Sequence, residues 1–292
     1  MILVTGGAGF IGSHVVDALL AAGEEPVVLD DFSSGDRANL PGEVEVVEAD
    51  VADPGVVARI STLRPRAVVH AAAQVSVAAS MQDPALDLAV NVGGTANVLA
   101  GARAAGAERF VFLSSGGGIY GETEGADENT LPRPKSYYGA HKYLAERYVE
   151  LDGISYAIAR LANVYGPRQR SDLEGGVVAI FAERLRKNLP VTINGSGEQS
   201  RDFVHVADVA NALLVIVSSR IEGTWNVGTG RAISILELLR TLEAEIRPAV
   251  EVRHGPARQG DVSNSRLSIK AIERDLGWRP GYDLARGVDS MA

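Results

Sequence analysis

A tyrosine and a lysine stand four positions apart in the stretch Tyr138-Gly139-Ala140-His141-Lys142. In a helix this spacing places Tyr138 and Lys142 on one face, one turn apart. An unperturbed phenol titrates at about 10 and is a poor base at neutral pH, but a neighbouring ammonium favours the tyrosinate. The pair therefore predicts a general base that removes a proton from a hydroxyl group. On spacing alone, a solvated helix face explains the same residues.

A stretch rich in serine and glycine runs from Ser114 to Gly118, directly after an apolar segment, Arg109 to Leu113. We expect that segment to be a buried strand, so its carboxyl end should face a ligand site. Ser115 is the candidate hydroxyl partner for a substrate, with Gly116 beside it. The alternative interpretation is a glycine turn capped by a serine.

Three glycines, Gly6, Gly9 and Gly12, lie between an apolar run and a stretch of helical spacing. Met1 to Val4 predicts a short buried strand, and Ser13 to Ala22 predicts a helix. A strand, a glycine turn and a helix together form a cradle for a phosphate, because the helix N-terminus offers free backbone N–H groups and a positive dipole end. A plain glycine turn is the alternative.

An acidic residue, Asp30, follows this motif after about twenty positions, as in dinucleotide-binding folds. It ends a second predicted strand, Pro26 to Leu29. A carboxylate there accepts hydrogen bonds from the adenosine ribose hydroxyls and repels a 2′-phosphate. The sequence therefore predicts NAD, not NADP, as the cofactor.

Strands and helices alternate through the first half of the chain, which indicates an α/β fold with a doubly wound, Rossmann-type parallel sheet. Further strands are expected at Val44–Val47, Ala67–His70 and Tyr156–Ala159, and helices at Gly55–Leu63, Leu86–Ala104 and Tyr137–Leu151. We assign residues 1–165 to an NAD-binding domain.

Residues 166–292 are assigned to a smaller C-terminal α/β lobe that binds the substrate, although Trp225 to Val227 is compatible with a return to the main sheet. Helices are expected there at Val177–Lys187, Val206–Val217, Ile235–Ile246 and Ser268–Leu276. Two arginines in polar loops, Arg201 and Arg258, are suited to clamping a diphosphate by bidentate hydrogen bonds. Together they indicate a nucleotide substrate, whereas either alone also fits a surface ion pair.

The composition excludes several classes of function. Among 292 residues, 28 Lys and Arg face 37 Asp and Glu, so the formal net charge of −9 argues against a nucleic-acid partner. The absence of cysteine excludes disulfides and thiolate catalysis and suits a cytoplasmic protein. No apolar run approaches the roughly 18 residues of a membrane span. No metal site is predicted.

The combination of Thr5-Gly-Gly-Ala-Gly-Phe-Ile-Gly-Ser-His14 with Asp30, Tyr138, Lys142 and Arg201-Asp202-Phe203 closely resembles the extended branch of the short-chain dehydrogenase/reductase superfamily. Within this branch the chain is most similar to the NAD-dependent UDP-glucose 4-epimerase group, over nearly its whole length. The resemblance implies reversible 4-epimerisation of a UDP-hexose (glucose and galactose) or of a UDP-hexuronate (glucuronate and galacturonate), through a transient 4-keto intermediate.

Carried over by position, the resemblance implies three sets of site residues. The catalytic set is Tyr138, Lys142 and Ser115. The cofactor set is the glycine turn with the acidic and small residues after the next strands: Gly6, Gly9, Phe10, Ile11, Gly12, Asp30, Asp31, Ser34, Asp50, Val51, Ala71, Ala72, Ala73, Asn91, Tyr138 and Lys142. The substrate set is Ser115, Gly116, Tyr138, Asn163, Gly176, Val177, Arg201, Arg258 and Asp261.

The sequence departs from the family pattern at one place. The usual catalytic serine or threonine position, counted back from Tyr120-Gly121, is Gly116. Related 4,6-dehydratases and decarboxylases carry acidic residues in this stretch, and glycine can supply no proton, so both reactions are disfavoured. Either Ser115 reaches the sugar after a local backbone shift, or a water replaces the missing hydroxyl.

Two other functions stay open: a nucleotide-sugar ketoreductase or another enzyme of the branch, and a catalytically inactive NAD-binding module. The resemblance also implies a homodimer in which the helices Leu86–Ala104 and Tyr137–Leu151 pair with their copies. We expect apolar surface on the first of them at Ala89, Val90, Val92, Ala96, Leu99 and Ala100.

Overall fold

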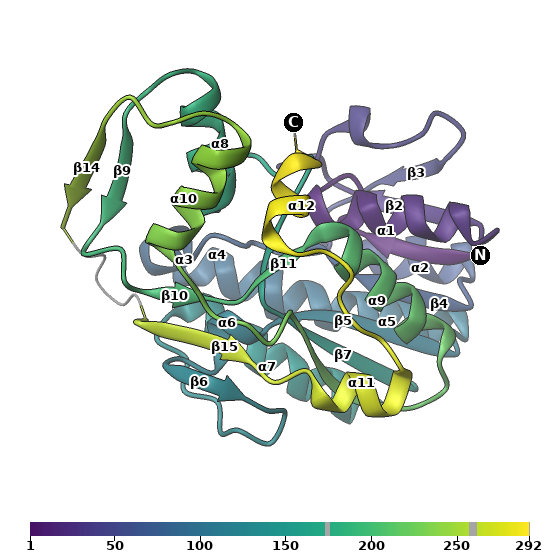
Figure 1. The fold of residues 1–292 in the computed structure, drawn as a ribbon. Helices are drawn as coiled ribbons and strands as arrows, with labels where there is room; N and C mark the ends of the chain where they lie inside the picture. The colour runs from purple at the N-terminus through teal and green to yellow at the C-terminus, as the bar shows by residue number, and fades with distance from the viewer. Residues whose placement is uncertain (173–175, 257–261, 292) are drawn as a thin grey trace.

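Seven parallel strands form the main sheet of the computed structural model, which describes residues 1–172, 176–256 and 262–291 (Figure 1). The strands are β1 (Ile2–Thr5), β2 (Pro26–Asp30), β3 (Glu45–Glu48), β4 (Ala67–His70), β5 (Arg109–Ser115), β7 (Tyr156–Leu161) and β12 (Gly223–Val227), in the order β12-β7-β5-β4-β1-β2-β3. All adjacent pairs are parallel, which confirms the predicted Rossmann-type fold. The strand order reverses between β1 and β4, where such sheets bind ligands.

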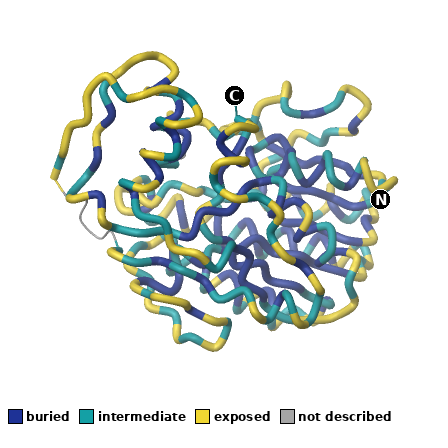
Figure 2. The backbone as a smooth tube through the Cα atoms, in the orientation of Figure 1, coloured by how far each residue is buried: buried dark blue, intermediate teal, exposed yellow. Residues whose placement is uncertain are grey.

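Helices cover both faces of this sheet, so the central strands are buried along most of their length and are largely apolar. On one face, α1 (Phe10–Ala21) packs beside α9 (Val206–Ser218), and both contribute to a core with Val4 and Trp225. On the other face lie α2 (Val56–Leu63), α5 (Thr95–Ala105) and α7 (Tyr137–Leu151). Figure 2 shows the sheet as the most deeply buried part of the chain.

The first helix begins at Phe10, three residues before the predicted start at Ser13. Its N-cap is Gly9, which makes no side-chain capping hydrogen bond. The glycine turn is therefore shorter than expected, and Phe10, Ile11 and Gly12 form the first helical turn.

The single helix predicted over Leu86–Ala104 is instead α4 (Pro84–Leu88), a π-helical segment η2 (Ala89–Gly94) and α5. The wider π turn coincides with Gly93 and Gly94, and a Cβ at Gly94 would lie 2.8 Å from a methyl carbon of Val51. This turn aims the Asn91 side chain inward. It also buries Val92 and Leu99 in the core, so the expectation that these two leave apolar surface is wrong.

The remaining elements form the smaller part of the fold. Its helices α8 (Val177–Arg186), α10 (Ile235–Glu245) and α12 (Leu284–Asp289) enclose a separate core. Its short strands pair as β13 (Ile233–Ser234), β10 (Ser200–Arg201), β15 (Asn264–Leu267) and β6 (Thr123–Ala126), as β11 (Phe203–His205) with β8 (Asn163–Tyr165), and as β14 (Val252–Gly255) with β9 (Val191–Asn194). Short helices η1 (Arg37–Asn39), α3 (Val77–Gln82), α6 (Gly116–Ile119) and α11 (Lys270–Leu276) complete the list.

Trp225 to Val227 belong to β12 and return to the main sheet beside β7. The division of the chain at residue 166 into two binding domains stays a prediction. Over the described ranges, no helix combines the length and apolar character that a membrane crossing needs.

Candidate active site

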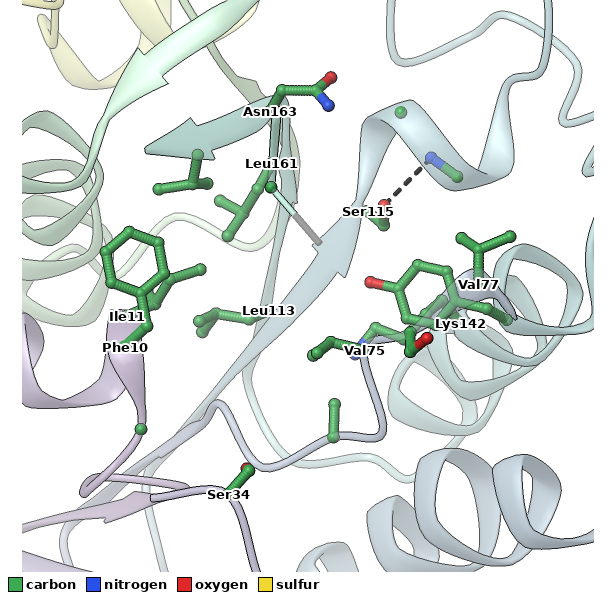
Figure 3. Close-up of a pocket in the computed structure, with 18 of the residues that line it drawn as sticks. Phe10, Ile11, Ser34, Val75, Val77, Leu113, Ser115, Lys142, Leu161 and Asn163 are labelled. Atoms are coloured by element: carbon green, nitrogen blue, oxygen red, sulfur yellow. Dashed lines mark hydrogen bonds between the residues drawn. The ribbon is translucent and has the colours of Figure 1, made fainter. Parts of the chain in front are cut away.

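A cleft of about 1340 Å³ lies at the carboxyl ends of the central strands and is bordered by residues from both parts of the fold (Figure 3). It brings together most residues of the predicted site: Gly6, Gly9, Phe10, Ile11, Gly12, Asp30, Asp31, Ser34, Asp50, Val51, Ala71, Ala72, Ala73, Ser115, Tyr138, Lys142, Asn163, Gly176, Val177 and Arg201. Arg258 and Asp261 lie outside the described residues.

The glycine turn at one end of the cleft admits no side chain. Gly6 has a φ of +66°, and a Cβ there would lie 2.6 Å from the backbone nitrogen of Ala72. A Cβ at Gly12 would lie 2.1 Å from the Gly6 carbonyl oxygen, so α1 can approach β1 this closely only with glycine. Because no side chain caps α1, its first N–H groups face the cleft in the way that a pyrophosphate requires.

Asp30 closes the turn from the end of β2. Its carboxylate accepts a hydrogen bond from the Ala8 N–H at 2.8 Å and one from the Phe32 N–H at 2.9 Å. Burial raises the pKa of Asp30 from its usual value, although the two N–H groups oppose this. Each carboxylate oxygen keeps a further lone pair for a ribose hydroxyl.

Tyr138 and Ser115 meet on the other side of the cleft. The Ser115 hydroxyl accepts the Gly118 N–H at 3.0 Å as the N-cap of α6, which leaves its own proton free to be donated. A Cβ at Gly118 would lie 2.9 Å from the Ser115 oxygen and 3.2 Å from Cε1 of the Tyr138 ring. The hydroxyl and the ring edge therefore border the same small space; both residues line the cleft, and Figure 3 shows Ser115 there.

Lys142 lies one turn further along α7 with only 3% of its surface exposed. Its ammonium stands 4.2 Å from the centre of the Phe112 ring. Burial lowers the pKa of Lys142 to about 7, while the carboxylates of Glu146 and Asp87 act in the opposite direction. The neighbouring His70 is buried as well, and burial together with the Lys142 charge lowers the pKa of His70 to about 3.

A buried ion pair between Glu146 and Arg160 joins α7 to the strand β7. Glu146 is fully buried and accepts Arg160 Nη2 at 2.6 Å and the Ser114 hydroxyl at 2.5 Å. Burial alone would lower the pKa of Arg160, but the hydrogen bond to Glu146 raises it above its ordinary value. Sequence reasoning missed Glu146, although its position four residues after Lys142 places it on the same helix face as Tyr138 and Lys142.

Two predicted site residues do not border the cleft. Asn91 is buried behind the loop that ends in Ser76, where its side chain donates to the Gln74 carbonyl at 2.9 Å and accepts the Gln74 N–H at 3.1 Å. Gly116 is buried at the start of α6, and a Cβ there would lie 2.6 Å from Leu267.

The substrate end of the cleft contains Asn163, Gly176, Val177 and Arg201. Directly after Arg201, the carboxylate of Asp202 is 1% exposed and accepts hydrogen bonds from the backbone and hydroxyl of Thr229 at 2.8 and 2.6 Å. Asp202 therefore fixes the chain on which Arg201 is carried.

Comparison with known proteins gives consistent results. Residues 2–228 match the NAD dependent epimerase/dehydratase family. A putative UDP-glucose 4-epimerase of Methanocaldococcus jannaschii is 42% identical over 294 residues, which cover 99% of this chain and 96% of that protein.

Two solved structures are similar over almost their whole length. The UDP-glucose 4-epimerase of Thermus thermophilus, in complex with NAD, has a TM-score of 0.95 and 44% sequence identity, covering 99% of this chain and 97% of that one. The UDP-glucose 4-epimerase of Thermotoga maritima, with UDP-glucose, has a TM-score of 0.95 and 41% identity, covering 99% and 96%.

Proposed function

Since this chain belongs to the NAD-dependent epimerase/dehydratase family, we propose that it is a UDP-sugar 4-epimerase that interconverts UDP-glucose and UDP-galactose. The observation that carries the proposal is one cleft with a glycine turn, the Asp30 carboxylate at the end of β2 and a Tyr138–Lys142 pair on one helix face. Full-length similarity to UDP-glucose 4-epimerases supports the choice of sugar.

The residues present fit NAD as the cofactor. Gly6, Gly9 and Gly12 leave the N-terminus of α1 without side chains that would oppose a pyrophosphate, and the Asp30 carboxylate beside this turn would bind the adenosine ribose. When bound, NAD supplies reversible two-electron oxidation at the sugar's C4.

Tyr138 acts as the general base that takes the proton from the 4-hydroxyl and later returns it. The Lys142 ammonium, one turn along α7, favours the tyrosinate. Ser115 donates a hydrogen bond to the oxygen on C4 of the sugar. Arg201 holds the diphosphate while the 4-keto ring rotates and presents its opposite face to the cofactor. Remote contacts to the nucleotide thus keep the reacting ring at the site through both half-reactions.

The glycines of α6 favour epimerisation over elimination of water or loss of carbon dioxide. Related enzymes that catalyse those reactions carry additional acidic residues in this stretch, and Gly116, Gly117 and Gly118 provide none. The space at Gly118 is too small for a side chain, because a Cβ would lie within 3.2 Å of both Ser115 and Tyr138. We propose that Ser115 stands in for the hydroxyl that the family pattern places at Gly116, because Ser115 borders the cleft and Gly116 does not.

Product analysis tests this proposal. Incubation with UDP-glucose should give UDP-galactose without net change in the absorbance of reduced nicotinamide. A ketoreductase would consume reduced cofactor in step with product, and an inactive NAD-binding module would bind the nucleotides without turnover. Conversion of UDP-glucuronate in preference to UDP-glucose would move the assignment to the hexuronate pair.

Replacing Asp30 should weaken the binding of NAD. We expect Asp30→Ala to raise the NAD dissociation constant by about tenfold to a hundredfold, since charge-assisted hydrogen bonds to a ribose are lost. Isothermal titration calorimetry with NAD measures the effect. Asp53→Ala is the control, because the Asp53 carboxylate accepts only the Gly55 N–H in an exposed loop among the hydrogen bonds described. Equal NAD affinity in Asp30→Ala and wild type would contradict the assignment of Asp30.

The apolar surface of α4 and α7 supports a homodimer. Leu86 is 54% exposed and Leu88 43% on the first, and Leu144 is 41% exposed and Tyr148 47% on the second. Since α4 packs against α7, these exposed apolar side chains lie on two neighbouring helices, and we propose that they contribute to a protein interface. The expected residues Val92 and Leu99 do not contribute to it.

Analytical ultracentrifugation at micromolar concentration should show a dimer. Leu144→Glu should give monomers, because a charge would be buried in the interface. Leu189→Glu is the matched control, since Leu189 is 44% exposed and follows α8 in the other part of the fold. A monomeric wild type would refute the dimer.

A further inference from the structure

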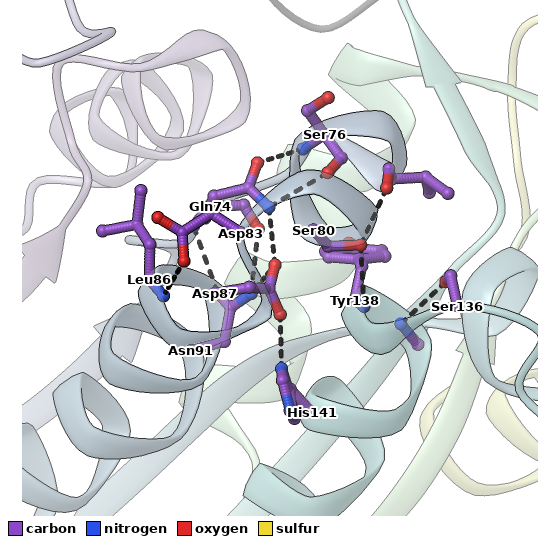
Figure 4. Close-up of polar contacts among 12 residues, drawn as sticks. Gln74, Ser76, Ser80, Asp83, Leu86, Asp87, Asn91, Ser136, Tyr138 and His141 are labelled. Carbon is purple, nitrogen blue, oxygen red and sulfur yellow. Dashed lines mark hydrogen bonds and ion pairs between the residues drawn. The ribbon is translucent and has the colours of Figure 1, made fainter.

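The segment that carries α3 and α4 contacts the catalytic helix α7 at two points (Figure 4). The contacts come from Ser80 and Asp87, both of which are fully buried although their neighbours Met81 and Leu86 are more than half exposed. Neither residue borders the cleft. Buried polar groups in otherwise exposed short helices need a specific partner, and both partners belong to α7.

Ser80 holds the backbone of the catalytic tyrosine. Its hydroxyl accepts the Tyr138 N–H at 3.1 Å and donates to the Val77 carbonyl at 2.7 Å. Ser136 serves as the N-cap of α7 and takes the next N–H, that of Gly139, at 3.2 Å. Ser80 therefore satisfies an orphan donor of α7 from another helix, and that donor belongs to Tyr138.

Asp87 holds α7 three residues further on. Its Oδ2 accepts the His141 Nδ1–H at 2.6 Å, directly before Lys142. Its Oδ1 accepts the side-chain amides of Gln74 at 2.5 Å and Asn91 at 3.1 Å. One carboxylate thus joins α7, the π turn and the loop before α3.

The same segment also faces the cofactor cleft. Ala73, Val75 and Ser76 border the cleft on either side of Gln74, and Val77 continues this wall into α3. Gln74 is fixed to Asn91 through both its backbone N–H and its carbonyl. Any shift of Asp87 would therefore move the cleft wall and α7 relative to each other.

We propose that Ser80 and Asp87 are positioning residues of the reaction, which hold Tyr138 and Lys142 in place against the cofactor-lining segment from Ala73 to Val77. This inference rests on the proposed function, because it assigns the two residues an effect on turnover through Tyr138 and Lys142. Neither residue touches the substrate.

Asp87 also contributes charge at Lys142. The groups that act on the Lys142 charge are Glu146 on its own helix and Asp87 on α4, His70 at the end of β4 feels the Lys142 charge, and His141 faces Asp87. Burial lowers the pKa of Lys142 to about 7, and the Asp87 carboxylate is one of the two groups that raise it. Without that charge, Lys142 loses its proton at a lower pH.

Ser80→Ala tests the first contact in the NAD-loaded enzyme. We expect kcat to fall by about tenfold or more, because misplacing a reacting group is costly, while KM for UDP-glucose stays within about twofold. Ser290→Ala is the matched control, since Ser290 also makes two hydrogen bonds, to His205 and Gly287, away from the cleft. Equal kcat values for Ser80→Ala and Ser290→Ala at equal melting temperature would overturn the role of Ser80.

Asp87→Asn tests the second contact, and it remains a test of the proposal if Ser80→Ala does not fold. The asparagine has the same size and keeps an acceptor for Gln74 and Asn91, so the fold should persist. The alkaline limb of kcat against pH should move to lower pH, which a purely structural role would not cause. An alkaline limb at the wild-type pH, with unchanged kcat, would overturn the role of Asp87.

Tyr138→Phe in the same assays separates this inference from the proposed function. If the wild-type enzyme gives no UDP-galactose from UDP-glucose, the proposed function fails, and if Tyr138→Phe retains turnover, only the base role of Tyr138 fails. If Tyr138→Phe is inactive while Ser80→Ala and Asp87→Asn behave like wild type, the proposed function stands and only the positioning role is wrong.

Discussion

Tyr138→Phe should reduce the turnover of UDP-glucose by about a hundredfold to ten-thousandfold, the range expected for loss of a general base. The substitution removes only the phenol oxygen, and the ring keeps its place beside Gly118 and Ser115. Binding of NAD and of UDP-glucose should therefore persist, so the loss should appear in kcat and not in affinity.

The control for this variant is Tyr143→Phe on the same helix. Tyr143 packs near the Arg147 guanidinium and does not border the cleft. Steady-state kinetics and NAD titration of both variants give the comparison. Turnover of Tyr138→Phe within about tenfold of wild type would remove Tyr138 from the role of base.

Glu146→Ala should destabilise the fold by about 3–5 kcal/mol, because it leaves a buried guanidinium without its carboxylate. Arg160 is 4% exposed, and its Nε and Nη2 both donate to Glu146. Ser114 would lose its acceptor as well. Urea denaturation without added NAD measures the free energy of unfolding, and the variant should unfold at a lower denaturant concentration.

Arg103→Ala provides the contrast, since the Arg103 side chain is 60% exposed in its ion pair with Asp152. We expect a small effect there, as exposed pairs are weak. If Glu146→Ala lowered the free energy of unfolding by less than about 1 kcal/mol, the prediction would be wrong, and water would have to reach Arg160 in place of the carboxylate.

The parts of the site that depend on short-range order could be predicted from the sequence. A Cβ at Gly9 or Gly12 would lie 3.2 or 2.1 Å from the Gly6 carbonyl oxygen, and Gly6 has a φ of +66°, so these requirements are local, whereas the close approach of Ala72 to Gly6 comes from the fold. Tyr138 and Lys142 share a helix, whose spacing alone sets their common face. Most strands of the main sheet are short apolar runs that alternate with helices, so a parallel sheet could be predicted, although its strand order could not.

The supporting contacts could not be predicted, because each joins segments distant in the sequence. The Asp87 carboxylate accepts hydrogen bonds from Gln74 in a loop, Asn91 in the π turn and His141 in α7. No periodic pattern in the sequence indicates this combination. The π turn that orients Asn91 looks like continuous helix in the sequence. In the sequence, Arg160 is a charged residue directly after a predicted apolar strand, and its partner is not evident. The structure shows that Arg160 forms an ion pair with Glu146.

The most direct test of the redox epimerisation is the fate of the hydrogen on C4. UDP-glucose deuterated at C4 should be converted to UDP-galactose with the deuterium still on C4, because the same hydrogen leaves one face of the ring and returns to the other. Mass spectrometry and NMR of the product measure this. Loss of the deuterium to water, or product in which the configuration at C4 is unchanged, would contradict the account.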